Sequence, residues 1–337
     1  MFVRICLLVI SLVWSVVVSA QESVNEAEAW ALGWPTMQGP YGNFQVPQTG
    51  LKLVDDLSDA KFVWESEDSD FGRAKHTTGA FKSSTPEGGA QKIRDILGPS
   101  PKATPGGWAA PIVAEGKLFA STFKPAGKLY DVESLYGSKA KAYLEADDLL
   151  IAIDAKTGKT VWKAAEPGGF VWGVGKRMGF QVAPVYNDGT VYSMGTTGRL
   201  FAYAAEDGKK LWETPALAQM LEEKEKHLAK SHILQASARY GWQQSLVFAG
   251  DTLIVPRGSA LVGRNPKDGT KRWELSNVIS KWTTPTVWKH DGKAYLLCAT
   301  GGTPGEARLN LIDPVAGRVL WTVEGLEATQ STLAHGE

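Results

Sequence analysis

Short apolar runs separated by turn residues recur along most of the chain. In APVYNDGTVYSMG (183–195), Asn-Asp-Gly lies between two segments of strand-forming residues, which is a strong signal for a β-hairpin. The segments 109–121, 244–256 and 284–298 have the same design, with Glu-Gly, Gly-Asp and Asp-Gly at their turns. These four segments therefore predict four hairpins of short antiparallel strands.

A second pattern follows each hairpin: an apolar run, a turn that contains glycine, and a tryptophan four residues after that glycine. Its fullest copy is AIDAKTGKTVW, with Ala152, Asp154, Gly158 and Trp162. The other copies carry Gly208 and Trp212, Gly269 and Trp273, and Gly317 and Trp321, and Asp313 keeps the acid. A pattern that returns every 48 to 61 residues is typical of repeat architectures. Each repeat predicts four antiparallel strands, and such units arranged radially are β-propeller blades.

The motif is better explained by architecture than by catalysis. Asp154 can accept backbone N–H groups two or three residues on, and Gly158 supplies the left-handed conformation of the turn. We expect Trp162 to pack against the neighbouring blade while its indole N–H finds a carbonyl. A catalytic or metal site would not be copied with Ala204 and Asn265 in the place of the acid.

These residues also carry a family resemblance. Ala152, Asp154, Gly158 and Trp162 resemble in full the tryptophan-docking motif of the PQQ-like, or quinoprotein-type, repeats. The segment 34–64, which begins WPTMQGPYGNF, resembles the lead-in of exported bacterial proteins of the BamB-like group. The resemblance implies an all-β fold, a β-propeller of four-stranded antiparallel blades, over most of the chain.

The number of blades follows from the tryptophans. Complete blades end at Trp162, Trp212, Trp273 and Trp321. Trp64 is typical of a last strand, which in such propellers completes the final blade, and STLAHGE (331–337) is typical of a first strand cut at its turn. Because propellers of this family usually have seven or eight blades, we expect the chain to be truncated at its C-terminus. The alternative is a half-ring that a partner chain completes.

The N-terminus predicts export. Residues 1–20 contain the apolar run ICLLVISLVWSVVV (5–18) followed by small residues, which is typical of a signal peptide with Gln21 as the mature start. A transmembrane anchor is the alternative, but the run is shorter than the roughly 20 residues that span a bilayer. We therefore expect an exported, periplasmic or secreted protein whose propeller domain covers 21–337, with no transmembrane anchor after cleavage.

Composition narrows the choice of partners. Lysine plus arginine and aspartate plus glutamate number 36 each, so no basic excess indicates nucleic acid or anionic lipid as a partner. Loss of Cys6 with the signal leaves Cys298 alone, which excludes an internal disulfide. The 13 tryptophans and 36 glycines favour a turn-rich fold with many aromatic anchors.

Three segments exceed the minimal repeat. Residues 66–107 are expected to form a long loop, and 124–147 a second loop insertion with a helix at 132–148. Residues 215–238 have apolar positions on one side and the charges of EEKEK on the other, which predicts an amphipathic helix. This helix either caps one face of the ring or docks a partner.

Aromatic and cationic side chains are expected at the mouth of the central channel. Aligning the first strands of the repeats places there Trp108, Gln181, Trp242, Trp282, Arg177, Arg239 and Lys281. Such groups could stack on and neutralise a planar or acidic ligand; alternatively, they fill the taper of the ring. His227 and His232 are five residues apart, which is not a facing spacing on a helix, so we expect no metal site there.

The sequence favours a non-catalytic exported scaffold that binds a protein partner or a small ligand. Similarity to the BamB-like group implies a role in outer-membrane protein assembly, although the signal lacks a lipid-accepting cysteine. The alternative is a dehydrogenase that uses pyrroloquinoline quinone (PQQ) and calcium. Such quinoproteins carry an adjacent cysteine pair, and this chain has only the isolated Cys298. We therefore predict no catalytic residue and no cofactor, with PQQ and calcium only under the alternative.

Overall fold

The computed structural model describes the following parts of the chain: residues 33–42, 44, 58, 61–68, 70, 109–132, 141–174, 182–216, 244–257, 260–278, 283–300 and 307–326. Every regular element in these parts is a β-strand, and the strands form four antiparallel sheets of four strands each. The all-β class and the four-stranded repeats predicted from the sequence are confirmed.

The sheets follow the chain in order. The first consists of β1 (Ile112–Ala114), β2 (Lys117–Val132), β3 (Lys141–Asp154) and β4 (Thr160–Val174). The second consists of β5 (Val185–Asn187), β6 (Thr190–Met194), β7 (Leu200–Ala204) and β8 (Lys210–Glu213). The third consists of β9 (Val247–Ala249), β10 (Thr252–Pro256), β11 (Leu261–Arg264) and β12 (Lys271–Leu275). The fourth consists of β13 (Thr286–His290), β14 (Lys293–Thr300), β15 (Ala307–Asp313) and β16 (Arg318–Leu326).

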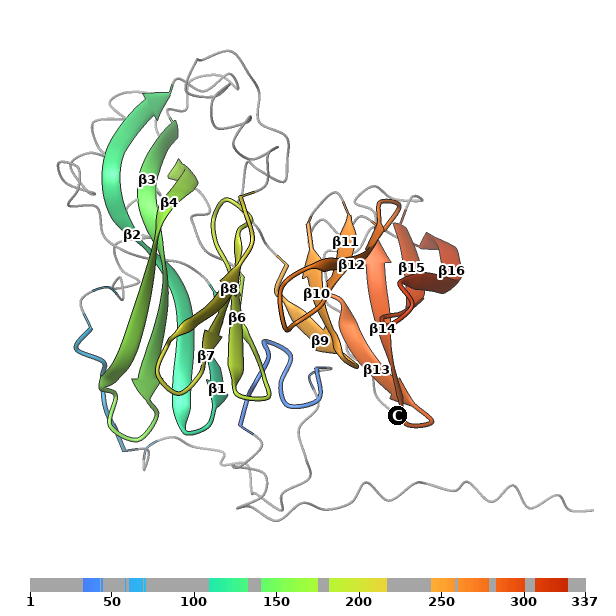
Figure 1. The fold of residues 1–337 in the computed structure, drawn as a ribbon, viewed down its shortest axis with the longest axis horizontal. Helices are drawn as coiled ribbons and strands as arrows, with labels where there is room; N and C mark the ends of the chain where they lie inside the picture. The colour runs from blue at the N-terminus through green and yellow to red at the C-terminus, as the bar shows by residue number, and fades with distance from the viewer. Residues whose placement is uncertain are drawn as a thin grey trace, which may run out of the picture.

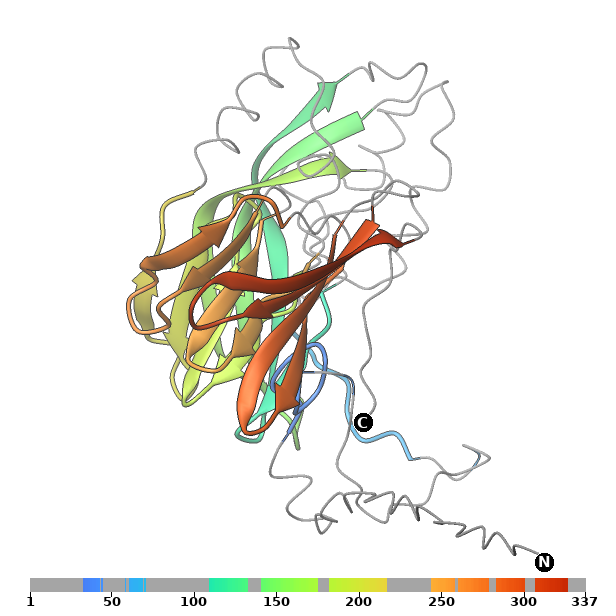
Figure 2. The same ribbon diagram turned by 90° about the vertical axis from the view of Figure 1, so that its right-hand side faces the viewer.

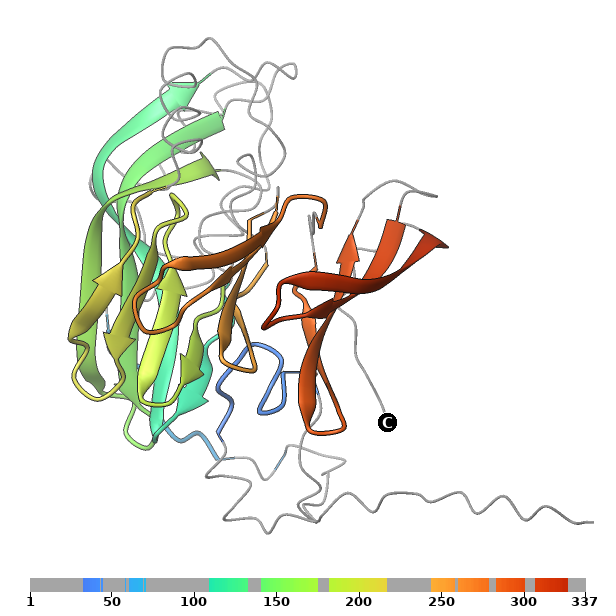
Figure 3. The ribbon, with the colours of Figure 1, turned by 45° about the vertical axis from the view of Figure 1, so that its right-hand side comes forward.

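The four sheets stand side by side as consecutive propeller blades (Figure 1). The first strands of neighbouring sheets contact one another, β1 with β5, β5 with β9, and β9 with β13. These strands therefore form the inner side of the arc, and the fourth strand of each sheet forms its outer side. Residues 33–42, in blue, lie against the inner strands (Figures 2 and 3).

The hydrophobic core lies between the sheets rather than within any one of them. Phe119 of the first sheet packs with Phe201 and Tyr203 of the second, and Tyr192 of the second packs with Phe248 of the third. A further cluster joins the third and fourth sheets through Ile254, Leu296 and Ile312. Because each blade buries its apolar face against the next, no blade could form a core alone.

The predicted hairpins are confirmed. In three of the four, the two-residue turn places Glu115 and Gly116, Asp188 and Gly189, or Asp291 and Gly292 at positive φ, between 45° and 72°, whereas in the third sheet only Gly250 of the turn has positive φ. Two consecutive left-handed residues define the type I′ turn, whose twist matches that of the flanking strands.

The helix predicted at 132–148 is wrong where the structure describes it. Val132 ends β2, and residues 141–148 belong to β3, where they pair with β2 and β4. The predicted loop at 124–147 is thus, in its described parts, extra length in the strands of the first blade. Alanine, glutamate and lysine in this stretch favour a helix locally, but cross-strand pairing on both sides decides.

Other sequence-based expectations fall outside the described residues. They concern the signal peptide, nearly all of the loop at 66–107, residues 217–238 of the helix predicted at 215–238, and the segment 331–337. The described part of the chain contains no helix that is long and apolar enough to cross a bilayer.

Candidate functional site

Each of the tryptophans Trp64, Trp162, Trp212 and Trp273 docks on the turn of the blade that follows it in the chain. Its indole N–H donates to the carbonyl oxygen of the residue three positions before that turn's glycine. The pairs are Trp64 with Ala155 at 2.9 Å, Trp162 with Ala205 at 3.1 Å, Trp212 with Pro266 at 2.8 Å and Trp273 with Pro314 at 2.9 Å. The prediction that Trp162 packs on the neighbouring blade and donates to a carbonyl is confirmed.

The glycine of each turn is required for two reasons. Gly158, Gly208, Gly269 and Gly317 all have φ between 63° and 75°, a left-handed conformation that glycine adopts without steric cost. A Cβ atom at Gly208 would lie 2.6 Å from the Trp162 ring, and one at Gly269 would lie 2.7 Å from Trp212. The ring therefore occupies the space that a side chain would need.

The acid of the motif stabilises its own turn. One carboxylate oxygen of Asp154 accepts the backbone N–H groups of Lys156 at 3.0 Å and Thr157 at 2.8 Å. Asp313 binds its turn in the same way, at 3.0 Å to each of two N–H groups. The second copy has Ala204, and its turn still closes by the bond from the Gly208 N–H to the Ala204 carbonyl at 2.9 Å. The acid is thus an aid to the turn and not a reactive group.

Trp321 differs from the other tryptophans of the motif. Its exposed fraction is 42 %, compared with 9 % for Trp162. The residue opposite on the preceding strand is Ala152, Ala202 or Gly263 for the docked tryptophans, but Leu311 for Trp321. A small cross-strand residue leaves room for the ring beside the sheet, and leucine does not.

Ion pairs reinforce the first two docking contacts. Asp68 and Glu166 each lie four residues after a docked tryptophan. Lys163 binds Asp68 at 2.7 Å and Asp70 at 2.6 Å, and Lys210 binds Glu166 at 2.9 Å. Burial disfavours the Asp68 carboxylate, but hydrogen bonds from Lys163 and Thr160 outweigh this effect and lower its pKa.

One fully buried carboxyl lies between the first and second sheets. The Oδ1 atom of Asp148 accepts the backbone N–H of Thr196 at 3.0 Å, whereas Oδ2 has no hydrogen-bond partner. Burial raises the pKa of Asp148 to about 6, although bonds from Thr196 and the charge of Arg199 act against this. A Cβ atom added at Gly195 would collide with Oδ2. Because the packed sheets enclose it, this carboxyl is a structural group rather than a catalytic candidate.

The N-terminal segment 33–44 crosses the hairpin ends of the inner strands. Trp34 and Val113 exchange two backbone hydrogen bonds, of 2.6 and 2.9 Å. The Tyr186 N–H donates to the Pro35 carbonyl at 2.8 Å, and the Val287 N–H donates to the Gly42 carbonyl at 3.0 Å. The inner strands of the first, second and fourth sheets therefore hold this segment by its backbone.

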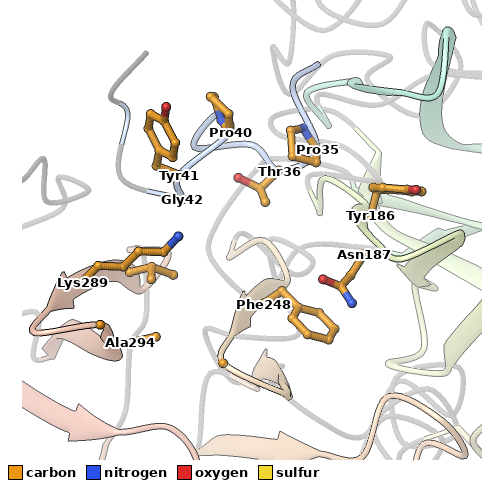
Figure 4. Close-up of a pocket in the computed structure, with 13 residues that line it drawn as sticks. Pro35, Thr36, Pro40, Tyr41, Gly42, Tyr186, Asn187, Phe248, Lys289 and Ala294 are labelled. Atoms are coloured by element: carbon orange, nitrogen blue, oxygen red, sulfur yellow. The ribbon is translucent and has the colours of Figure 1, made fainter. Parts of the chain in front are cut away.

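A cavity of about 590 Å³ lies beneath this segment. We call it the hairpin-end pocket; it is lined by residues 35, 36 and 40–42 and by the hairpins of the second, third and fourth sheets. Figure 4 shows Asn187, Phe248 and Lys289 directed toward the space below Thr36 and Tyr41. The volume is in the range typical of ligand sites. The sequence reasoning missed this pocket because the backbone bonds that shape it leave no pattern of residue types.

Comparison with known protein families identifies the family of this chain. A family model described as "Outer membrane protein assembly factor BamB" (PQQ_2) matches residues 146–332, just over half of the chain. The chain belongs to this family. The matched region contains the fullest copy of the docking motif and its three weaker copies, so the predicted PQQ-like, BamB-like identity is confirmed.

Solved structures with a similar fold include both assembly factors and enzymes of this repeat type. BamB from Moraxella catarrhalis is 14 % identical over 62 % of this chain and 54 % of that one, with a TM-score of 0.36. A europium-containing methanol dehydrogenase is 13 % identical over 64 % of this chain and 50 % of that one, with a TM-score of 0.35. A quinohemoprotein alcohol dehydrogenase from Comamonas testosteroni is 17 % identical over 64 % of this chain and 42 % of that one, with a TM-score of 0.37. The chain spans about half the length of these structures. Among curated proteins, no significant match is found.

The described residues do not fit a PQQ and calcium site. Cys298 is fully buried between the third and fourth sheets, where burial raises the pKa of its thiol to about 12. It packs as a small apolar side chain and has no cysteine neighbour in the sequence. No group of three His, Cys, Asp or Glu side chains suited to a metal ion occurs in the described part of the chain.

The residues predicted at the channel mouth lie outside the described parts of the chain. These are Trp108, Gln181, Trp242, Trp282, Arg177, Arg239 and Lys281. Their convergence on a ligand stays a prediction. The residues of the docking motif, by contrast, are all described and all structural.

Proposed function

We propose that this protein is a non-catalytic, exported binding scaffold that takes part in the assembly of outer membrane proteins. Membership of a family described by that role supports the proposal. The observation that carries it is the backbone hydrogen bonding of residues 34–42 to Val113, Tyr186 and Val287 on three inner strands. The inner strands thus bind another stretch of chain through its backbone, and pairing of a segment with a free strand edge is a general mode of protein recognition.

Export is the second part of the proposal. Residues 1–20 have the composition of a cleavable signal, and an outer-membrane role requires passage across the inner membrane. The protein produced in a Gram-negative host should appear in the periplasmic fraction with Gln21 as its first residue, as read by mass spectrometry of the intact chain. A cytoplasmic chain that retains residues 1–20 would overturn this part.

The binding role is tested with the mature full chain. In separate arms, it is titrated with the periplasmic domain of an outer-membrane assembly machine and with a denatured outer membrane protein diluted from urea. We expect a saturable complex in at least one arm, measured by light scattering, whereas absence of a complex in both would reject the scaffold.

A third arm tests the enzyme alternative. The same chain is mixed with PQQ and Ca²⁺, freed of excess by gel filtration, and assayed for a bound chromophore and for alcohol-dependent dye reduction. A stoichiometric chromophore with dye reduction would establish the dehydrogenase and reject the non-catalytic function.

A further inference from the structure

The N-terminal segment skips one of the four inner strands. It pairs with the first, second and fourth sheets, and between Thr36 and Gly42 it turns back on itself through bonds within the segment. The third sheet faces this turn across the hairpin-end pocket, where Phe248 and Gly250 form part of the wall. The pocket is therefore the interval at which the backbone pairing of the segment is interrupted.

The strand facing this interval has a backbone edge ready for pairing. Phe248 lies opposite Leu253 in its hairpin, in the same position before the turn as Val113 and Tyr186 in theirs. At this position of an antiparallel pair, the N–H and C=O groups point away from the hairpin partner. Both groups of Val113 and the N–H of Tyr186 bond to the N-terminal segment, whereas no hydrogen bond between described residues reaches the backbone of Phe248 on this side.

The side chains in the pocket favour an acidic occupant. Lys289 lies with its ammonium 6.0 Å from the centre of the Tyr41 ring and forms no ion pair with any described residue. The lining residues include the amide of Asn187 and no carboxylate. The nearby Glu115 is engaged by the Tyr186 hydroxyl at 2.6 Å. Phe248 and Tyr41 offer ring faces to an apolar side chain.

From this arrangement we infer that the hairpin-end pocket binds an extended peptide segment carrying a carboxylate. The segment pairs with the backbone edge of Phe248, its carboxylate meets Lys289, and Asn187 donates to it from the opposite wall. The inference deepens the proposed scaffold function and rests on it, because it names the chemistry of the segment that the scaffold recognises.

The test uses the mature full chain and three fluorescein-labelled hexapeptides, with binding followed by fluorescence polarisation. The first is Val-Glu-Val-Glu-Val-Glu with a C-terminal amide, the second is its glutamine counterpart, and the third is the glutamine peptide with a free C-terminal carboxylate. We expect the glutamate peptide to bind about tenfold more tightly than its glutamine counterpart, because a charge-assisted hydrogen bond is lost in the latter. Equal affinity of the third and first peptides would assign the carboxylate to a chain end.

Variants locate the interaction. Lys289→Met keeps the apolar stem and removes the charge, so it should abolish the preference for glutamate, while Lys289→Arg should retain it. Lys293→Met is the matched control, since Lys293 lies on the same hairpin and does not line the pocket; it should change nothing. Equal binding of the glutamate and amidated glutamine peptides, an unchanged preference in Lys289→Met, or no binding would each reject the inference. If the assembly-machine complex still forms in that case, the scaffold function stands without this pocket.

Discussion

Trp162 and Trp321 hold the same position in two copies of one motif, yet Trp162 is buried against the next blade and Trp321 is exposed. Trp162 is seated on the turn of the next blade, with its ring against Gly208. Trp321 is 42 % exposed and has no seat among the described residues. A tryptophan at this position can thus dock, and it does so where the turn of a following blade lies against it.

This difference gives a prediction at the residue scale. Trp162→Ala should lower the free energy of unfolding by about 3–5 kcal/mol, because it removes a buried ring and leaves a cavity. Trp321→Ala should cost roughly 1 kcal/mol, since much of its ring is already in water. Urea denaturation of the two variants measures both values. Equal losses in the two variants would contradict the docking assignment.

The motif also marks the limit of what sequence alone predicts about a residue. Gly158 and Trp162 are required by a conformation and a contact that only those residue types satisfy, so the pattern was visible. A sequence difference that sets Trp321 apart is Leu311, which stands opposite it where the docked copies have Ala152, Ala202 or Gly263. That signal is interpretable only once the cross-strand register is known.

At the scale of the elements, the contact between the first and second sheets is sensitive to pH. Asp148 has a folded-state pKa of about 6 against an ordinary value of 3.8. The folded state therefore holds a proton that the unfolded chain releases. The stabilisation from this group is complete below pH 4 and is lost as the pH rises through 6.

The expected size is about 3 kcal/mol, at 1.36 kcal/mol for each pKa unit. Asp148→Asn does not titrate, so the unfolding free energy of the native protein relative to that variant should fall by this amount between pH 3 and pH 8. Urea titrations at several pH values check it. A difference that is independent of pH would show that Asp148 titrates normally in the folded protein.

The elements also show where sequence-based prediction failed. The hairpins were predictable because Asp-Gly and Glu-Gly turns admit two left-handed residues. Residues 141–148 were assigned to a helix because alanine, leucine and glutamate favour one, and the pairing of β3 with the elongated β2 and β4 overrides that preference. The pairing of the N-terminal segment with the inner strands was not predicted, because Val113, Tyr186 and Val287 hold it through backbone atoms that every residue has.

For the whole molecule, the free energy of unfolding should contain a separate contribution from each tryptophan-docking contact between neighbouring blades. We call each such contact, a tryptophan ring on the turn of the next blade, a seat. Gly208→Ala places a Cβ against the Trp162 ring, whereas Gly189→Ala, at a nearly equal φ of 72°, meets no atom within 4 Å. Gly189→Ala should cost about 1–2 kcal/mol for the left-handed conformation alone. Gly208→Ala should lower the free energy of unfolding by more than this, because the added Cβ also displaces the Trp162 ring from its docking contact.

Double variants test this independence. Gly208→Ala and Trp162→Ala share a seat, so Gly208→Ala made in the Trp162→Ala background should cost no more than Gly189→Ala. Gly208→Ala and Trp273→Ala affect different seats, so their losses should add to within about 0.5 kcal/mol. A strongly non-additive loss for these two distant docking contacts would contradict the view that each contact stabilises only its own pair of blades.

The direction of docking has a consequence for how the protein is made. Each docked tryptophan packs on a turn that lies later in the sequence. Because a chain leaves the ribosome from its N-terminus, every blade emerges with a large aromatic ring uncovered until the following repeat has been synthesised. A translational pause between repeats therefore prolongs the exposure of one ring at a time, and the blades are completed in the order in which they are translated.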